Sequence, residues 1–231
     1  MTFGRGIQLV GAAVLLSACA VPVAQQKSQL DATLAQLDQS ASKFTSAQAK
    51  FHKELYTAVV HDTDQQDGIT YASRKGGASE VGIKIEGNGA RTVVYKNGTA
   101  KDYNPGLNCY NTYSAANSKG TIESLLALAF GASGTELKAA WIITDVGPET
   151  LTVDGKSVKV EKLNLVPKDQ GLKNNIKHIE LWTDLTTAVS LKQIVYSPSG
   201  DTQTATYSNL LLNQKKLDTA PFEIKGKPCG K

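Results

Sequence analysis

The sequence predicts a mainly β, α+β fold: one curved antiparallel sheet that forms a half-open barrel, with helices across its concave face. Three observations predict it. Short segments of alternating polar and apolar residues are joined by Asn-Gly, Asp-Gly and similar pairs, which are typical of β-hairpins. Several strands mix polar and apolar residues on both faces, which favours a strongly curved sheet with one face toward water. Two amphipathic helical stretches, one before the strands and one between them, can cover the other face.

The chain starts with a predicted leader. Arg5 precedes an apolar run, Ile7–Ala18, which has the length of a secretory signal and is too short to span a bilayer of about 30 Å. The sequence Leu16-Ser17-Ala18-Cys19 resembles the lipobox of bacterial lipoproteins, in which the cysteine carries the lipid. We therefore expect a signal peptide over residues 1–18 and a membrane anchor through lipid attached to Cys19. The alternative is an ordinary signal peptide with an accidental Cys19.

After the anchor we expect a tether over residues 19–27 and then one domain over residues 28–231. Apolar residues recur at steps of three and four from Leu30 onward, which predicts a helix that Ser28 or Asp31 can cap. The helix should end near Ala47. From Lys50 to Val60 the alternation fits a strand better, so we place a strand there.

Turn sequences then divide the chain into short strands that should pair antiparallel with their neighbours. Asn-Gly and Asp-Gly pairs supply the positive φ angles that two-residue hairpins need. The turn signals are Asp67-Gly68, Gly76-Gly77, Gly87-Asn88-Gly89, Asn97-Gly98, Asp154-Gly155 and Pro198-Ser199-Gly200-Asp201.

One helical segment interrupts the predicted strands. Five apolar residues at helical spacing predict an amphipathic helix that Gly131 and Gly134 break. The segment continues as helix from Glu136 to Ala140, and Trp141-Ile142-Ile143 resumes as strand. The five residues of the amphipathic stripe are Ile122, Leu125, Leu126, Ala129 and Phe130.

Charge and cysteine content narrow the classes of protein. Without Arg5 the chain has 24 basic and 21 acidic side chains, an excess of +3 that gives no basis for nucleic-acid binding. Cys109 and Cys229 form an even pair in an exported protein, and we expect a disulfide between them. Two unpaired thiols are the alternative. Neither cysteine has a second ligand at metal-binding spacing, so no metal site is predicted.

No catalytic motif is found in the sequence. His52, His61 and His178 lie far apart, and there is neither a G-x-S-x-G elbow nor a phosphate-binding loop. We therefore predict no enzyme, no catalytic residue and no cofactor. A hydrolase is a distant third interpretation, which needs Ser, His and Asp side chains brought within about 3 Å of one another.

The C-terminal third carries a hydrophobic strand, a Pro-Lys pair, a polar loop, a charged strand and a Gly-Asp hairpin in this order. The segments are Val160–Lys168, Ile176–Trp182, Leu191–Gln193, Ser199–Asn209 and Pro221–Ile224. This succession resembles the LolA-like family of periplasmic lipoprotein carriers, which includes the outer-membrane receptor LolB.

The resemblance implies a protein that binds acyl chains of lipids or lipoproteins in an apolar hollow between the sheet and the helices, together with an envelope transport partner. It also implies a latch for the helical lid at Arg74, in Ser73-Arg74-Lys75-Gly76-Gly77, although a solvated hairpin charge is the alternative. From the faces of the predicted elements, we expect the cavity to be lined by Leu125, Leu126, Phe130, Trp141, Ile143, Ile179 and Leu181.

Two functions are consistent with these expectations. The first is an envelope lipoprotein that faces the periplasm and takes part in lipid or lipoprotein transport or sorting. Ala20 stands where an aspartate would retain enterobacterial lipoproteins in the inner membrane, so the outer membrane is favoured. The second is a half-barrel module that transports nothing and contacts a protein partner for envelope sensing or assembly, with its cavity filled by its own side chains.

Overall fold

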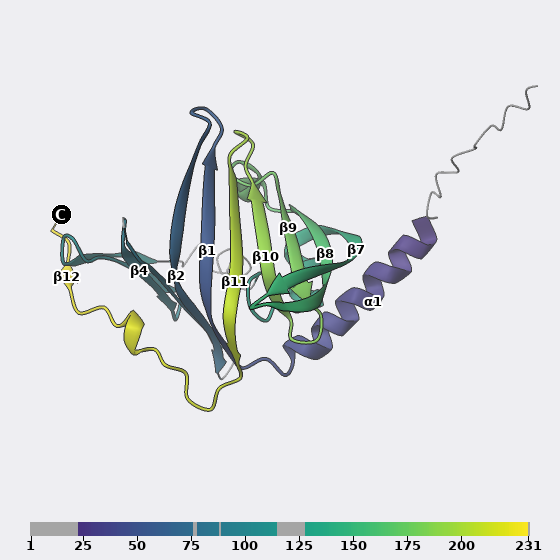
Figure 1. Ribbon diagram of the computed structural model, residues 1–231, viewed down its shortest axis with the longest axis horizontal. Helices are drawn as coiled ribbons and strands as arrows, with labels where there is room; N and C mark the ends of the chain where they lie inside the picture. Colours follow the sequence, from purple (N-terminus) through teal and green to yellow (C-terminus); the bar gives the residue numbers. More distant parts are fainter. Residues whose placement is uncertain (1–22, 76–77, 88, 115–127, 231) are drawn as a thin grey trace, which may run out of the picture.

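The computed structural model describes residues 23–75, 78–87, 89–114 and 128–230 (Figure 1). They form one open, curved, 12-stranded sheet in the order β12-β6-β5-β4-β3-β2-β1-β11-β10-β9-β8-β7. Neighbouring strands pair antiparallel except β12 with β6, which are parallel. The predicted fold class is therefore confirmed, with this one parallel pair as an addition.

The elements of the sheet and of its covers have the following bounds. The strands are β1 (Ser46–Thr57), β2 (Asp62–Lys75), β3 (Ala78–Ile85), β4 (Arg91–Lys96), β5 (Thr99–Asn104), β6 (Cys109–Ser114), β7 (Trp141–Val153), β8 (Lys156–Pro167), β9 (His178–Asp184), β10 (Val189–Tyr196), β11 (Thr202–Leu212) and β12 (Lys227–Pro228). The helices are α1 (Val23–Ala41), α3 (Gly134–Ala140), α4 (Gln170–Lys173) and the 3-10 turn η1 (Ala220–Phe222).

Two predicted hairpins show the expected turn chemistry. Asn97 and Gly98 have φ of 51° and 74°, and the strands they join pair from Lys96 and Thr99 outward. Asp154 and Gly155 have φ of 50° and 73° between β7 and β8. Both pairs supply the positive φ angles that a two-residue turn demands, so these two predictions are confirmed.

The predicted turn at Asp67-Gly68 is wrong, because both residues lie inside β2. Gly68 faces the Phe51 ring on β1, and a Cβ at Gly68 would stand 2.7 Å from the Phe51 Cζ atom. The same Cβ would meet the Lys84 carbonyl oxygen at 2.0 Å. Glycine is required here by close packing within the sheet and not by a change of chain direction.

The boundary between the first helix and the first strand also differs from the prediction. The helix already begins at Val23, inside the predicted tether, and it ends at Ala41. The strand begins at Ser46 because from there on β1 pairs with β11. Asn213, the residue after β11, holds the preceding residue: its Oδ1 atom accepts the Thr45 backbone N–H at 2.8 Å. The strand ends at Thr57, three residues earlier than predicted, where the turn to β2 begins.

The described part of the inserted segment, residues 128–140, departs from the prediction at two positions. Ala129 and Phe130, expected to be helical, run beside the start of β10: Phe130 forms a β-bridge with Val189, and the Ser190 N–H donates to the Ala129 carbonyl at 2.9 Å. Backbone pairing with β10 thus replaces the helix at these two positions. The rest of that predicted stripe, at positions 122–126, lies outside the described residues. The helix predicted at Glu136–Ala140 is confirmed as α3.

Three covers pack against the sheet. The helices α1 and α3 lie on one face, which we call the helix face, beside β7, β8 and β9. Figure 1 shows α1 at this end of the sheet. The C-terminal segment 213–230, which we call the strap, crosses the opposite face toward β12. The far half of the β7–β8 hairpin crosses β9 and β10 to reach β11, where the Asn209 N–H donates to Asp154 at 2.8 Å (Figure 1). None of the described helices is long and apolar enough to cross a membrane.

Candidate binding site between the helices and the sheet

The helices α1 and α3 form one unit, which we call the helix pair. The Asp38 carboxylate accepts hydrogen bonds from the Thr135 backbone N–H and hydroxyl, at 2.9 and 3.0 Å. Gly134 approaches α1 so closely that a Cβ there would stand 2.2 Å from the Leu34 carbonyl oxygen. A glycine permits this approach, so the two helices are fixed against each other.

An apolar layer lies beneath the helix pair. Leu37 of α1 is 0% exposed and Leu137 of α3 is 3% exposed. They join a hydrophobic cluster whose sheet residues share one face, because Leu163 pairs with Leu181 in the register of β8 and β9. The helix pair is therefore held to the β7–β9 end of the sheet by apolar contacts. The buried residues of this cluster are Leu34, Leu37, Ala41, Leu128, Ala132, Leu137, Trp141, Leu163, Leu165, Ile179, Leu181 and Ala188.

A second buried cluster continues the helix face toward β1, β2 and β3. The Phe130 ring meets the Tyr207 ring edge-on, with centroids 5.2 Å apart. The Phe44 ring lies over Gly131, where a Cβ would stand 2.4 Å from it. Buried apolar residues thus lie on the helix face at both ends of this span, near β7 and on β3. The members of the cluster that lie on this face include Phe44, Ala47, Ala49, Phe51, Ala72, Val81, Phe130, Val189, Leu191, Ala205 and Tyr207.

A charged contact joins the helix pair to the other half of the sheet. The Arg74 guanidinium on β2 lies 3.0 Å from the Glu136 carboxylate on α3. Burial alone raises the pKa of Glu136, but the Ser133 backbone N–H and Arg74 outweigh it and hold that pKa below its usual range. The predicted latch residue therefore contacts the helical segment. Whether it controls opening stays a prediction.

Two carboxyl groups lie buried beneath α1. Asp145 on β7 is 4% exposed and Glu161 on β8 is 9% exposed. The Thr33 hydroxyl of α1 donates to the Asp145 carboxylate at 2.7 Å. Burial, and the hydrogen bond and negative charge of Asp145, raise the pKa of Glu161 to about 7. Below that pH Glu161 holds a proton, which reduces the negative charge that is buried beneath α1.

Trp141 places an unused hydrogen-bond donor beneath the helix pair. The residue stands where α3 ends and β7 begins, and its side chain is 1% exposed. Among the described residues its indole Nε1 has no acceptor. Because a buried indole N–H normally has a partner, this donor is available to the oxygen of a water molecule or a ligand.

The structure divides the predicted cavity residues into groups. Trp141, Ile179 and Leu181 belong to the cluster beneath the helix pair, and Ile143 packs partly buried at its edge. Phe130 belongs to the second cluster. Cys19, Leu125 and Leu126 lie outside the described residues. The disulfide predicted between Cys109 and Cys229 is present.

Sequence reasoning missed several residues of this site. The buried pair Asp145 and Glu161 gave no local signal, because the two residues are sixteen positions apart and meet only through the register of β7 and β8. Tyr207 and Phe51 were also missed. Both stand on alternating strands, so the period-two pattern could have placed them on the helix face.

The sequence matches no protein-family model and no curated protein. Solved structures, however, resemble its fold. One is the crystal structure of MucB, with a TM-score of 0.52 and 15% identity over 84% of this chain and 62% of the MucB chain. This chain thus spans about three fifths of the MucB chain that it matches. MucB from Pseudomonas aeruginosa has also been solved in complex with MucA.

Two further structures match this chain over nearly the whole of their own length. An uncharacterised conserved protein from Thermus thermophilus matches with a TM-score of 0.53 and 12% identity, over 87% of this chain and 98% of that one. A LolA superfamily protein from Nitrosomonas europaea matches with a TM-score of 0.40 and 12% identity, over 84% and 97%. At these identities the likeness concerns the fold alone.

Proposed function

We propose that this chain is an envelope protein that binds the acyl chain of a lipid or lipoprotein between the helix pair and the helix face of the sheet. In this proposal it takes part in lipid or lipoprotein transport or sorting and carries out no catalytic step. The resemblance of its C-terminal third to LolA-like carriers and its fold both support this function.

The observation that carries the proposal is the apolar character of much of the helix face. Two buried clusters lie on it, one with Leu181 beneath the helix pair and one that reaches Val81 on β3. Burial of an acyl chain yields about 0.8 kcal/mol for each CH₂ group, so an apolar face that opens can hold a long chain without a charged partner.

The contacts of the helix pair suggest how the face opens. At β7, β8 and β9 the pair is held by the buried leucine cluster and by the hydrogen bond from Thr33 to Asp145. On the β2 side the exposed contact between Arg74 and Glu136 joins it to the sheet. An exposed ion pair contributes little, so we expect the β2 side to separate first and the β7 side to act as the hinge.

Trp141 suggests how the polar end of an acyl ligand is held. Its indole N–H is buried and lacks an acceptor among the described residues. An ester or amide carbonyl at the head of the acyl chain supplies that acceptor. The hydrogen bond from the Trp141 indole N–H then orients the ligand with its carbonyl near the start of β7.

The location proposed for this protein follows from Cys19. Lipid attached there anchors the chain to a membrane and leaves the domain on the periplasmic side, with the outer membrane favoured by Ala20. Several acyl chains on one residue give stable anchoring where a single chain is reversible.

Native mass spectrometry tests this function. The full chain carrying Cys19→Ser is purified from a bacterial envelope without detergent, and we expect one added lipid mass per chain. Phe130→Glu should remove that mass. Its control is Ile142→Glu, on the exposed opposite side of β7, which should keep it. A protein that stays free of lipid when phospholipid and acylated peptide are offered contradicts the proposal.

A second candidate is a module that contacts a protein partner. Two observations favour it: the buried leucine cluster beneath the helix pair consists of the chain's own side chains, and MucB, whose fold is similar, is solved in complex with the protein MucA. This candidate predicts a lipid-free mass together with a partner that survives mild detergent extraction of the anchored protein.

A further inference from the structure

The part of the strap from Phe222 to Cys229 borders an open cavity on the face of the sheet opposite the helix pair. One end of this part is fixed by Phe222, which is 2% exposed and whose ring lies 4.6 Å from the Tyr71 ring. Gly82 makes room for this contact, because a Cβ there would stand 2.1 Å from the Tyr71 ring and 3.0 Å from Phe222.

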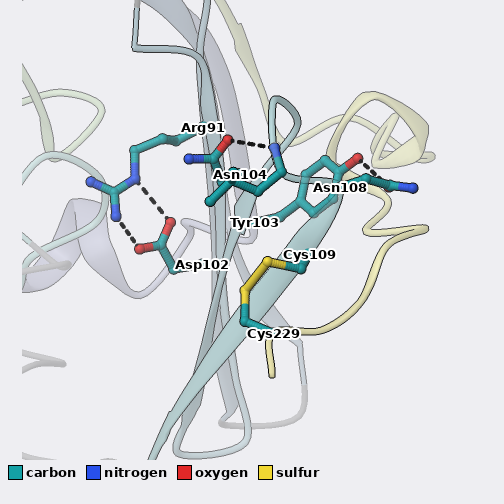
Figure 2. The surroundings of a disulfide bond; sticks show 8 residues. Arg91, Asp102, Tyr103, Asn104, Asn108, Cys109 and Cys229 are labelled. Atoms are coloured by element: carbon teal, nitrogen blue, oxygen red, sulfur yellow. Dashed lines mark hydrogen bonds and ion pairs between the residues drawn. A yellow bond between two sulfur atoms is a disulfide. The ribbon is translucent and has the colours of Figure 1, made fainter. Parts of the chain in front are cut away.

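The other end of the strap is fixed covalently. Cys229 is bonded to Cys109 on β6 (Figure 2), and its backbone N–H donates to the Tyr110 carbonyl at 3.0 Å. Just before it, Gly226 packs on the Tyr103 ring, where a Cβ would stand 2.5 Å away. Both ends are thus tied to the sheet, and the stretch between them spans β4 and β5.

A cavity of about 370 Å³ lies between this stretch and the β4–β5 hairpin. Its apolar lining comes from both sides: Val94 from β4, and Phe222 and Ile224 from the strap. The volume falls within the range of about 300–1,000 Å³ that is typical of small-molecule sites. It suits a single short chain.

The rim of the cavity is polar and includes two lysine side chains. Lys96 and Lys101 line it together with Asn97 and Thr99, and no carboxylate is among the lining residues that the structure describes. The Lys96 ammonium also pairs with Glu80 at 2.8 Å, and the Lys101 ammonium lies 4.7 Å from the centre of the Tyr110 ring. These contacts hold the two cations beside the opening.

We infer that this cavity, which we call the strap site, binds a single-chain amphiphile with an anionic head. The apolar wall of Val94, Phe222 and Ile224 takes the chain, and Lys96 and Lys101 take the carboxylate or phosphate. An ammonium that binds an anion at the mouth of an apolar pocket forms a charge-assisted hydrogen bond, which is stronger than a neutral one.

The strap site is independent of the function proposed for the helix face. Val94 pairs with Gly82 and Lys101 in the sheet register, and Gly82 in turn with Tyr71, so these side chains share the face opposite the helix pair. A ligand on one face therefore touches no residue of the other site. Each site can be lost while the other is retained.

Titration calorimetry with decanoate tests the inference on the full chain carrying Cys19→Ser. We expect Lys101→Glu to weaken decanoate binding by about tenfold or more, because a carboxylate then faces the carboxylate head. Lys101 is exposed, so this variant should fold, which its thermal unfolding checks. The control is Lys215→Glu, the same charge change at an exposed lysine outside the cavity, which should leave the affinity unchanged.

Other probes separate the head from the chain. Decyl phosphate should bind like decanoate and lose affinity in the same variant, whereas decyltrimethylammonium and inorganic phosphate should bind at least about tenfold more weakly. Both lysine variants should bind the same amount of decanoate on the helix face, so binding there does not hide the difference in affinity at the strap site. Equal decanoate affinity in Lys101→Glu and Lys215→Glu overturns the inference, and so does equal binding of the cationic amphiphile.

Discussion

The helix pair and the strap cover opposite faces of the same sheet, and they are held to it by different means. The helix pair rests on buried leucines and a few polar contacts, and every one of these contacts can break and re-form. The strap is tied near its C-terminal end by the disulfide between Cys109 and Cys229 and at its middle by the buried Phe222. Of these two covers only the strap is bonded covalently to the sheet, which is why we place the exchangeable cargo beneath the helices.

Removal of the disulfide should have the largest effect on stability of the changes considered. The bond closes a loop between residues 120 positions apart, so replacing both Cys109 and Cys229 by Ser should lower the free energy of unfolding by about 4 kcal/mol. Denaturant titration measures the loss. Hydrogen exchange should accelerate in the strap and not in the helix pair, and equal acceleration in both would mean that the covers are not independent.

Truncation of a leucine in the buried cluster should loosen the helix pair. Leu37 is 0% exposed, so Leu37→Ala should cost about 3 kcal/mol and speed hydrogen exchange in α1 and α3. The strap should keep its protection. Leu211→Ala, at a residue that is 51% exposed, is the matched control and should cost less than about 0.5 kcal/mol. A loss from Leu37→Ala no larger than that of the control contradicts the buried cluster.

The stability of the folded protein should depend on pH through Glu161, which lies beneath α1 of the helix pair. Its pKa in the folded protein is raised to about 7, so the folded state binds more protons than the unfolded state between the ordinary glutamate pKa of about 4.3 and about 7. Stability from this group is therefore full below about pH 4.3 and lost as the pH rises through about 7. The midpoint of thermal unfolding should fall over this window.

The variant Glu161→Gln isolates this effect, because its side chain stays neutral at every pH. Its thermal midpoint should change less between about pH 5 and about pH 8 than that of the unsubstituted protein. Acid has the opposite effect through Glu136, whose pKa is lowered, so its contribution is lost below the ordinary glutamate pKa. An identical pH profile for Glu161→Gln and the unsubstituted chain argues against the buried carboxyl pair.

The smallest expected effect on stability is that of the latch. The Arg74 and Glu136 side chains are 23% and 49% exposed, so Arg74→Ala should cost less than about 1 kcal/mol. Lipid exchange measured by fluorescence should nevertheless become faster, because the β2 side of the helix pair is released. The matched control is Arg91→Ala, which removes the ion pair with Asp102 between β4 and β5 (Figure 2) and should leave exchange unchanged.

The sequence predicted the parts of this fold that depend on local chemistry. The hairpin at Asn97-Gly98 and the helix that ends at Ala140 follow from turn and periodicity rules that act over a few residues. The disulfide followed from the two cysteines that remain once Cys19 is assigned to the lipid. Each of these features needs no knowledge of which distant segments meet.

The wrong predictions involve contacts between distant segments. Asp67-Gly68 has the composition of a turn, yet the glycine sits in mid-strand because the Phe51 ring approaches it. Ala129 and Phe130 have helical spacing, yet β10 supplies backbone partners for them. In both cases a residue far along the chain overrides the local preference. The strap site was missed for the same reason, because its two walls, Val94 and Ile224, are 130 positions apart.

The disulfide of the strap also sets an order of events in the making of the protein. Cys229 follows Cys109 by 120 positions, so at about 5–20 residues per second the ribosome adds it about 6–24 s later. During that interval Cys109 has no native partner, while β7 to β11 are still being added. The bond therefore cannot form until every strand of the sheet has been synthesised, because Cys229 follows even β12 in the chain.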